Sequence, residues 1–153
     1  MILSSYQLPV WVWPAALMGV CGLAVWRGRD EERLAAGGVL AGWALSRIAY
    51  KSASQDLQWG IMAIDLMLLG LYVWLALRSR RYWPLFAAGF QLLAIITHIG
   101  RALDTGISGW AYLTAELVWS YLGLFAIGYG AWTAPHHAPT DTEPNEVPGA
   151  TRR

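Results

Sequence analysis

The stretch that decides the fold of this chain is YWPLFAAGFQLLAIITHIGRALD, residues 82–104. It is long enough to cross a bilayer as a helix, which takes roughly 17–25 residues. Its centre, from Leu85 to Ile96, has almost no polar side chains, whereas a helix of a soluble bundle needs a polar face at helical spacing. The stretch therefore predicts a transmembrane helix and disfavours a soluble helical bundle.

The composition of the whole chain supports the same class. Of its 153 residues, 56% are hydrophobic and 14% are charged, whereas soluble domains carry about 25% charged residues. The net charge is only +1 and the arginines fall in short clusters, so we expect no nucleic-acid partner. The single cysteine, Cys21, cannot form an intrachain disulfide or a paired-cysteine metal motif.

Four more apolar runs accompany the first one. The five predicted spans are about Leu8–Trp26, Leu34–Tyr50, Gln58–Leu77, Tyr82–Asp104 and Gly109–Trp132. The second span is at the short limit for crossing, so a re-entrant or tilted segment is its alternative. The predicted fold class is all-α: a polytopic membrane helical bundle with five transmembrane helices, residues 1–132. The remainder, 133–153, has four prolines and almost no large apolar side chain, which predicts a disordered cytoplasmic tail.

The distribution of arginine predicts the orientation. The links at residues 27–33 (RGRDEER) and 78–81 (RSRR) are rich in arginine, and the tail ends in Arg152 and Arg153. The other two links offer only Lys51 or no cation. Because arginine-rich loops stay in the cytoplasm, we expect a multi-pass protein of the bacterial inner membrane with a periplasmic N-terminus and a cytoplasmic C-terminus.

Two further features agree with this orientation. Residues 1–10 contain no Lys or Arg, so they lack the basic start of a cleaved signal peptide, and we expect the first span to be retained. Seven of the ten tryptophans fall at predicted membrane boundaries, where indole rings gather. These are Trp11, Trp13, Trp59 and Trp110 at the outer boundary, and Trp26, Trp83 and Trp132 at the inner one.

Small residues on two spans predict close helix contacts. Gly38 and Gly42 form a GxxxG step, and Ala126 and Gly130 form a small-xxx-small step. Such steps let two backbones approach closely in lipid. The sequence leaves open whether they join helices within one chain or between copies in a homo-oligomer. Pro14 lies within the first predicted span, where we expect a kink.

Six ionisable residues lie inside the spans, all in the predicted outer half. They are Arg47, Asp65, His98, Arg101, Asp104 and Glu116. Charge within hydrocarbon is costly and marks functional positions, so these residues are the candidate ligand or proton site. At a rise of 1.5 Å per residue, Asp65 and Glu116 lie roughly 10 Å below the outer boundary.

A structural interpretation of this set is an ion cluster that ties the helices together. We expect Arg101 to pair with Glu116 or Asp65, and Arg47 to pair with another of the acids, because guanidinium binds carboxylate through two parallel N–H groups. Arg101 and Asp104 could instead extend to the headgroup level. That alternative would leave Asp65, His98 and Glu116 as the more meaningful set.

Two functional hypotheses follow from the sequence. The first is an accessory or scaffold subunit of a larger membrane complex, favoured by the small size and the glycine-bearing helix faces. The alternative is a polar pocket open to the periplasm, which binds a proton, a quinone head group or a small polar ligand in transport or sensing. An imidazole such as His98 can change its charge between pH 5 and 8.

A metal-dependent membrane enzyme is a less favoured hypothesis. Asp65, His98 and Glu116 are ligand types that suit zinc or iron, but the sequence has no HExxH, GxSxG or P-loop motif. A bis-histidine haem would need two facing imidazoles, and retinal would need a lysine within a helix. We therefore assign no catalytic residue, no metal ligand and no cofactor.

Overall fold

The computed structural model describes residues 11–52, 57–104, 106 and 108–135, and within these ranges all regular structure is α-helical. The helices are α1 (Val12–Arg27), α2 (Asp30–Ser52), α3 (Leu57–Arg78), α4 (Trp83–Leu103) and α5 (Gly109–Trp132). The predicted all-α class is confirmed. Disorder was predicted for residues 133–153, and residues 136–153 of this tail lie outside the described residues. The side chains of Tyr50, Gln58 and Trp59 also lie outside them.

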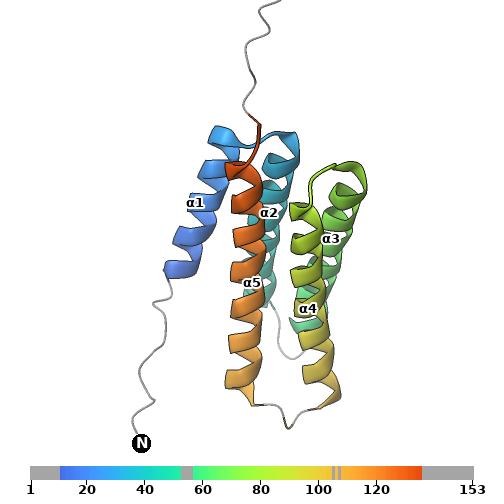
Figure 1. Cartoon of the computed structure of the whole chain (residues 1–153). Helices are drawn as coiled ribbons and strands as arrows, with labels where there is room; N and C mark the ends of the chain where they lie inside the picture. Colours follow the sequence, from blue (N-terminus) through green and yellow to red (C-terminus); the bar gives the residue numbers. More distant parts are fainter. Residues whose placement is uncertain (1–10, 53–56, 105, 107, 136–153) are drawn as a thin grey trace, which may run out of the picture.

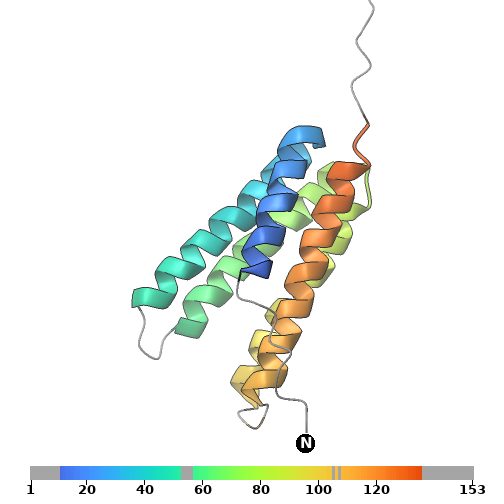
Figure 2. The same cartoon turned by 90° about the vertical axis from the view of Figure 1, so that its left-hand side faces the viewer.

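The five helices form one bundle in which consecutive helices run in opposite directions (Figure 1). α4 packs mainly against α3 and α5, and α1 packs against α5 and α2. The α1–α2 link, the α3–α4 link and the end of α5 lie at one end of the bundle, which we call the arginine-rich end. The opposite end is called the far end. There the α2–α3 pair leans away from α4 and α5 (Figure 2).

Three helices are long and apolar enough to cross a membrane. They are Gly60–Arg78, Trp83–Leu103 and Gly109–Trp132. Helix α1 is apolar but has only 16 residues, and α2 has 23 residues but begins with three acidic ones. A membrane location is therefore plausible from three helices, and the full set of five spans stays a prediction.

The helix ends follow from local sequence. Pro84 lies in the first turn of α4, where its missing N–H costs no hydrogen bond. The Ser108 hydroxyl caps α5 by accepting from the Ala111 amide at 3.2 Å. Pro14 lies in the first turn of α1, which begins at Val12. A proline in the first turn removes no hydrogen bond within the helix, so Pro14 is accommodated at the start of α1 without the expected kink.

Both predicted small-residue steps are used within the chain. On α2, a Cβ added to Gly38 would lie 2.5 Å from a methyl group of Leu71, and one added to Gly42 would lie 3.0 Å from Leu68. On α5, a Cβ added to Gly130 would lie 2.7 Å from the Trp83 ring. The steps therefore bring α2 against α3 and α5 against α4.

Trp83 differs from its predicted role at the membrane boundary. Its ring is only 3% exposed, and it belongs to the hydrophobic core that also contains Ala87 and Ile127. Gly130 leaves the space that the ring fills. By contrast, the rings of Trp26 and Trp132 are exposed at the same end. A tryptophan at a boundary position can thus turn inward when a glycine on the next helix makes room for it.

Candidate functional site

Three of the six predicted site residues meet between three helices. His98 of α4 lies between Asp65 of α3 and Glu116 of α5. Its Nε2 atom is 3.0 Å from Asp65 Oδ2 and 3.5 Å from Glu116 Oε2. All three side chains are largely buried. We call these residues the acid–histidine cluster, and they lie in the part of their helices nearer the far end.

The second ring nitrogen of His98 contacts a tyrosine. Tyr112 OH lies 2.8 Å from His98 Nδ1, and the two rings meet edge to face. Because Nε2 faces two carboxylates, it is the nitrogen that carries a proton in either charge state of the ring. Tyr112 can then donate to a neutral ring or accept from a protonated one, since a phenol does both.

Asp65 is the better satisfied of the two carboxylates. Its Oδ1 atom accepts a hydrogen bond from Gln91 Nε2 at 2.9 Å, while Oδ2 faces His98. Gln91 and His98 are seven residues apart on α4, so two helical turns place them on one face. Both oxygens of Asp65 therefore have a partner that holds them.

Glu116 differs from Asp65 in this respect. Its Oε2 atom faces His98, but its Oε1 atom is buried and has no hydrogen-bond partner among the described residues. Buried polar atoms without a partner are rare in folded proteins and point to a bound water, an ion or a function. Glu116 also lines a cavity, together with Asp65 and Gln91.

This cavity has a volume of about 90 Å³. Its wall includes two tryptophans whose ring nitrogens are hydrogen-bonded. Trp13 Nε1 donates to Ser120 Oγ at 3.0 Å, and Trp119 Nε1 donates to Thr97 Oγ1 at 3.1 Å. Since a water molecule occupies roughly 30 Å³ in the liquid, the space suits a few waters or a small ligand, whereas a quinone ring would need it to widen.

Both acids pair with His98, a contact that we did not predict from the sequence. The ion pairs of Asp65 and Glu116 within 4.0 Å are made with His98. Arg47 is exposed and has no ion pair within the part of the chain that the structure describes. The cluster therefore combines two carboxylates with one imidazole.

The other two candidates lie at the end of α4. Asp104 is exposed and caps that helix, and its Oδ1 atom accepts from the Gly106 amide at 2.8 Å. Arg101 lies in the last turn of α4, where a positive charge interacts favourably with the negative end of the helix dipole. Asp65, His98 and Glu116 are the three candidates that the structure brings into direct contact with one another.

The geometry gives the metal hypothesis no support. In the described ranges, no three His, Cys, Asp or Glu side chains are placed so that they could hold a metal ion. The arrangement is instead one in which a single proton can be shared between an imidazole and two carboxylates.

A second polar cluster lies at the arginine-rich end, and sequence reasoning missed it. The Glu32 side chain is 0% exposed and forms an ion pair with Arg81. Its Oε2 atom also accepts from the Arg29 amide at 2.8 Å. Arg81 in addition donates to the Gly130 carbonyl and the Thr133 hydroxyl, both at 2.6 Å.

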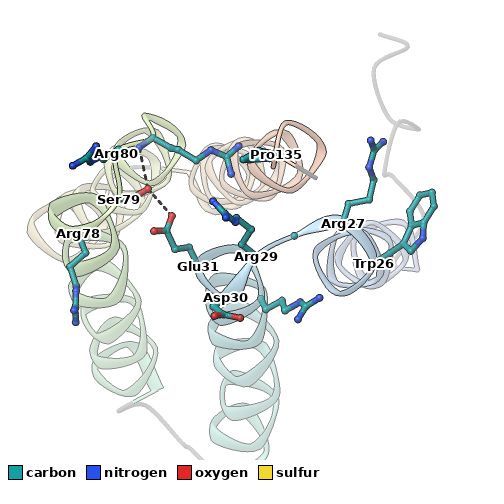
Figure 3. Close-up of a pocket in the computed structure, with 12 residues that line it drawn as sticks. Trp26, Arg27, Arg29, Asp30, Glu31, Arg78, Ser79, Arg80 and Pro135 are labelled. Carbon is teal, nitrogen blue, oxygen red and sulfur yellow. Dashed lines mark hydrogen bonds between the residues drawn. The ribbon is translucent and has the colours of Figure 1, made fainter. Parts of the chain in front are cut away.

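A hydroxyl completes this cluster. Ser79 donates to Glu31 at 2.7 Å and accepts from the Arg81 amide at 3.1 Å (Figure 3). The cluster thus joins the α1–α2 link, the α3–α4 link and the end of α5. The signal for it was the acidic run of Asp30, Glu31 and Glu32 inside an otherwise basic link.

Comparison with protein-family models, with curated proteins and with solved structures finds no match to this chain.

Proposed function

We propose that this chain is an integral protein of the bacterial inner membrane that crosses the bilayer five times, with its N-terminus in the periplasm and its C-terminus in the cytoplasm. Support comes from three helices of spanning length and from the gathering of both arginine-rich links at one end of the bundle. A fourth helix, α1, is apolar but short. Arginine-rich loops favour the cytoplasm, so the far end would face the periplasm.

Within this framework, the acid–histidine cluster acts as a binding site for a proton or for a small ligand that donates hydrogen bonds. The observation that carries this proposal is the buried Glu116 Oε1 atom, which has no partner among the described residues and belongs to a side chain that lines the cavity. Two carboxylates beside a neutral imidazole repel each other in a medium of low dielectric constant. An added proton or a hydrogen-bond donor relieves that repulsion.

Tyr112 gives the cluster a means to accept both states. When His98 is neutral, the Tyr112 hydroxyl donates to Nδ1, and when His98 is protonated, Nδ1 donates to the hydroxyl oxygen. The contact of 2.8 Å can therefore persist while a proton is gained or lost. Proton uptake would then need little movement of the helices.

Nuclear magnetic resonance of histidine nitrogens tests this proposal. The chain has three histidines, so replacing His136 and His137 with alanine leaves His98 as the only labelled ring. In lipid nanodiscs we expect Nε2 to stay protonated between pH 5 and 8, while Nδ1 changes its state. Glu116→Gln should alter the pH at which this occurs.

Infrared spectra of the same samples report the carbonyl band of a protonated carboxyl group, and that band should change when Glu116 is replaced. The matched control is Asp104→Asn, which removes a carboxylate outside the cluster. A proton site would be ruled out if neither the ring nitrogens nor the carboxyl band responded to pH in this range.

Reporter fusions test the topology. Fusions after Ser54 and Gly106 should give periplasmic alkaline phosphatase activity, and fusions after Arg80 and Arg153 should give cytoplasmic fluorescence of a green fluorescent protein. If the fusions after Ser54 and Arg153 report the same compartment, the number of crossings between them is even and the proposed topology fails.

The role of accessory subunit remains a second proposal. The two small-residue steps that favoured it lie against α3 and α4 of the same chain, so a partner or a second copy would have to bind another surface. Purification in a mild detergent followed by mass measurement tests it, since recovery as a lone monomer would count against it.

A further inference from the structure

The arginine-rich end contains a large basic cavity. It has a volume of about 1120 Å³ and lies between the α1–α2 link and the α3–α4 link (Figure 3). Two acidic residues, Asp30 and Glu31, line it together with six arginines. The arginines are Arg27, Arg29, Arg33, Arg78, Arg80 and Arg81. The excess of positive charge favours an anionic ligand.

Four of the six guanidinium groups already have a partner in the protein. Arg81 holds Glu32, Arg33 donates to a backbone carbonyl, and Arg27 and Arg78 each lie over a tryptophan ring. Arg29 and Arg80 are exposed, and neither guanidinium has a partner among the residues that the structure describes. These two can therefore bind a ligand without breaking an existing contact.

An apolar groove adjoins the cavity. It runs between α4 and α5, has a volume of about 950 Å³ and is lined mainly by aromatic and aliphatic side chains, among them Phe86 and Phe125. Both of these rings are exposed. Arg80 and Arg81 line the groove as well as the cavity, so charge and apolar surface meet at this point.

We propose that the groove and Arg80 together bind one anionic phospholipid from the leaflet at the arginine-rich end. Its phosphate lies at Arg80, and an acyl chain lies along the groove between Phe86 and Phe125. Guanidinium binds phosphate through two N–H groups, and basic pockets between membrane helices on the cytoplasmic side bind anionic headgroups. The inference rests on the membrane placement proposed above, but not on the acid–histidine cluster.

Native mass spectrometry of the full chain tests this inference. The protein, purified in detergent, is titrated with phosphatidylglycerol and with phosphatidylcholine that carries the same acyl chains. We expect tighter binding of phosphatidylglycerol, and Arg80→Gln should weaken it about fivefold. The matched control is Arg47→Gln, which removes the same charge at an exposed position outside the site and should change nothing.

Two further arms identify the source of the phosphate and the role of the groove. The double variant Phe86→Ala/Phe125→Ala should weaken both lipids, because the groove binds their acyl chains. Glycerol phosphate at millimolar concentration should fail to displace phosphatidylglycerol. Displacement would show that the ligand is a soluble phosphate. The inference would also be overturned if the two lipids bound with equal affinity. The same holds if a polypeptide were found bound in the groove.

The stability of Arg80→Gln is checked by circular dichroism, and Arg80→Lys should keep part of the preference for phosphatidylglycerol. Failure of the membrane placement is recognised separately, because the protein would then be soluble without detergent. Failure of the proton site would leave the lipid titration unchanged.

Discussion

The two carboxylates of the acid–histidine cluster should respond in opposite ways to neutralisation. Asp65→Asn removes a charge whose two oxygens both have partners, His98 and Gln91. Glu116→Gln removes a charge with one buried oxygen that has no partner among the described residues. The side chains are exposed to a similar degree, 18% for Asp65 and 22% for Glu116. A difference between the variants therefore reports the partners rather than the burial.

The magnitudes follow from these contacts. Asp65→Asn loses a charged contact of 3.0 Å with His98, and hydrogen bonds to charged groups contribute about 1.5–3 kcal/mol. Glu116→Gln loses only the longer contact of 3.5 Å. In return it removes a buried negative charge that has a neighbouring carboxylate, Asp65, on the other side of His98, and burial and a like charge both disfavour the charged form. We expect Asp65→Asn to lower the free energy of unfolding by about 2 kcal/mol, and Glu116→Gln to leave it unchanged or raise it.

Unfolding by sodium dodecyl sulfate in mixed micelles, followed by circular dichroism, measures both values. Asp104→Asn is the control, because that exposed side chain can keep its contact with the Gly106 amide, and surface changes stay within about 0.5 kcal/mol. If Glu116→Gln destabilises the protein as much as Asp65→Asn does, Glu116 is a structural partner of His98. The proposed open binding position would then be refuted.

Two further predictions concern the rest of the bundle. Glu32→Gln should lower the free energy of unfolding by about 3 kcal/mol, because it leaves Arg81 without its buried counterion; an unchanged detergent unfolding curve would contradict this. Gly130→Ala should destabilise by about 1–3 kcal/mol through its clash with the Trp83 ring. On the same helix Gly123→Ala meets nothing within 4 Å and should be neutral or stabilising, so equal effects of the two alanines would show that the close approach is not needed.

The helical class and the helix positions could be predicted because they depend on local sequence. Apolar runs of sufficient length and the breaks between them predict where helices begin and end. The structure extends the second helix to Asp30, four residues before the predicted start at Leu34. The acidic run there reads as a loop by hydropathy alone, but acidic side chains favour the first turn of a helix.

The partners within the site could be predicted only in part. Helical spacing puts Gln91 and His98 on one face of α4, and both of these residues contact Asp65. Spacing likewise puts Tyr112 and Glu116 on one face of α5, and both of these contact His98. Spacing does not give the rotation of one helix against the next. It therefore could not show that His98 faces both acids.

The same limit explains why the cluster at the arginine-rich end was missed. Glu32 lies among exposed charges in the sequence, and only the fold brings Arg81 from a link 49 residues away to meet it. In the sequence, Glu32 therefore resembles an ordinary surface charge.

The contrast between the two polar clusters argues that the acid–histidine cluster does more than hold helices together. At the arginine-rich end, both oxygens of the buried Glu32 have partners, one in Arg81 and one in the Arg29 amide. At the far end, where the helix pairs lean apart (Figure 2), Glu116 keeps one oxygen without a partner among the described residues. A purely structural polar cluster gains most when every group is satisfied, as the first cluster is. The incomplete one is therefore the place where a proton or ligand can add a stabilising contact.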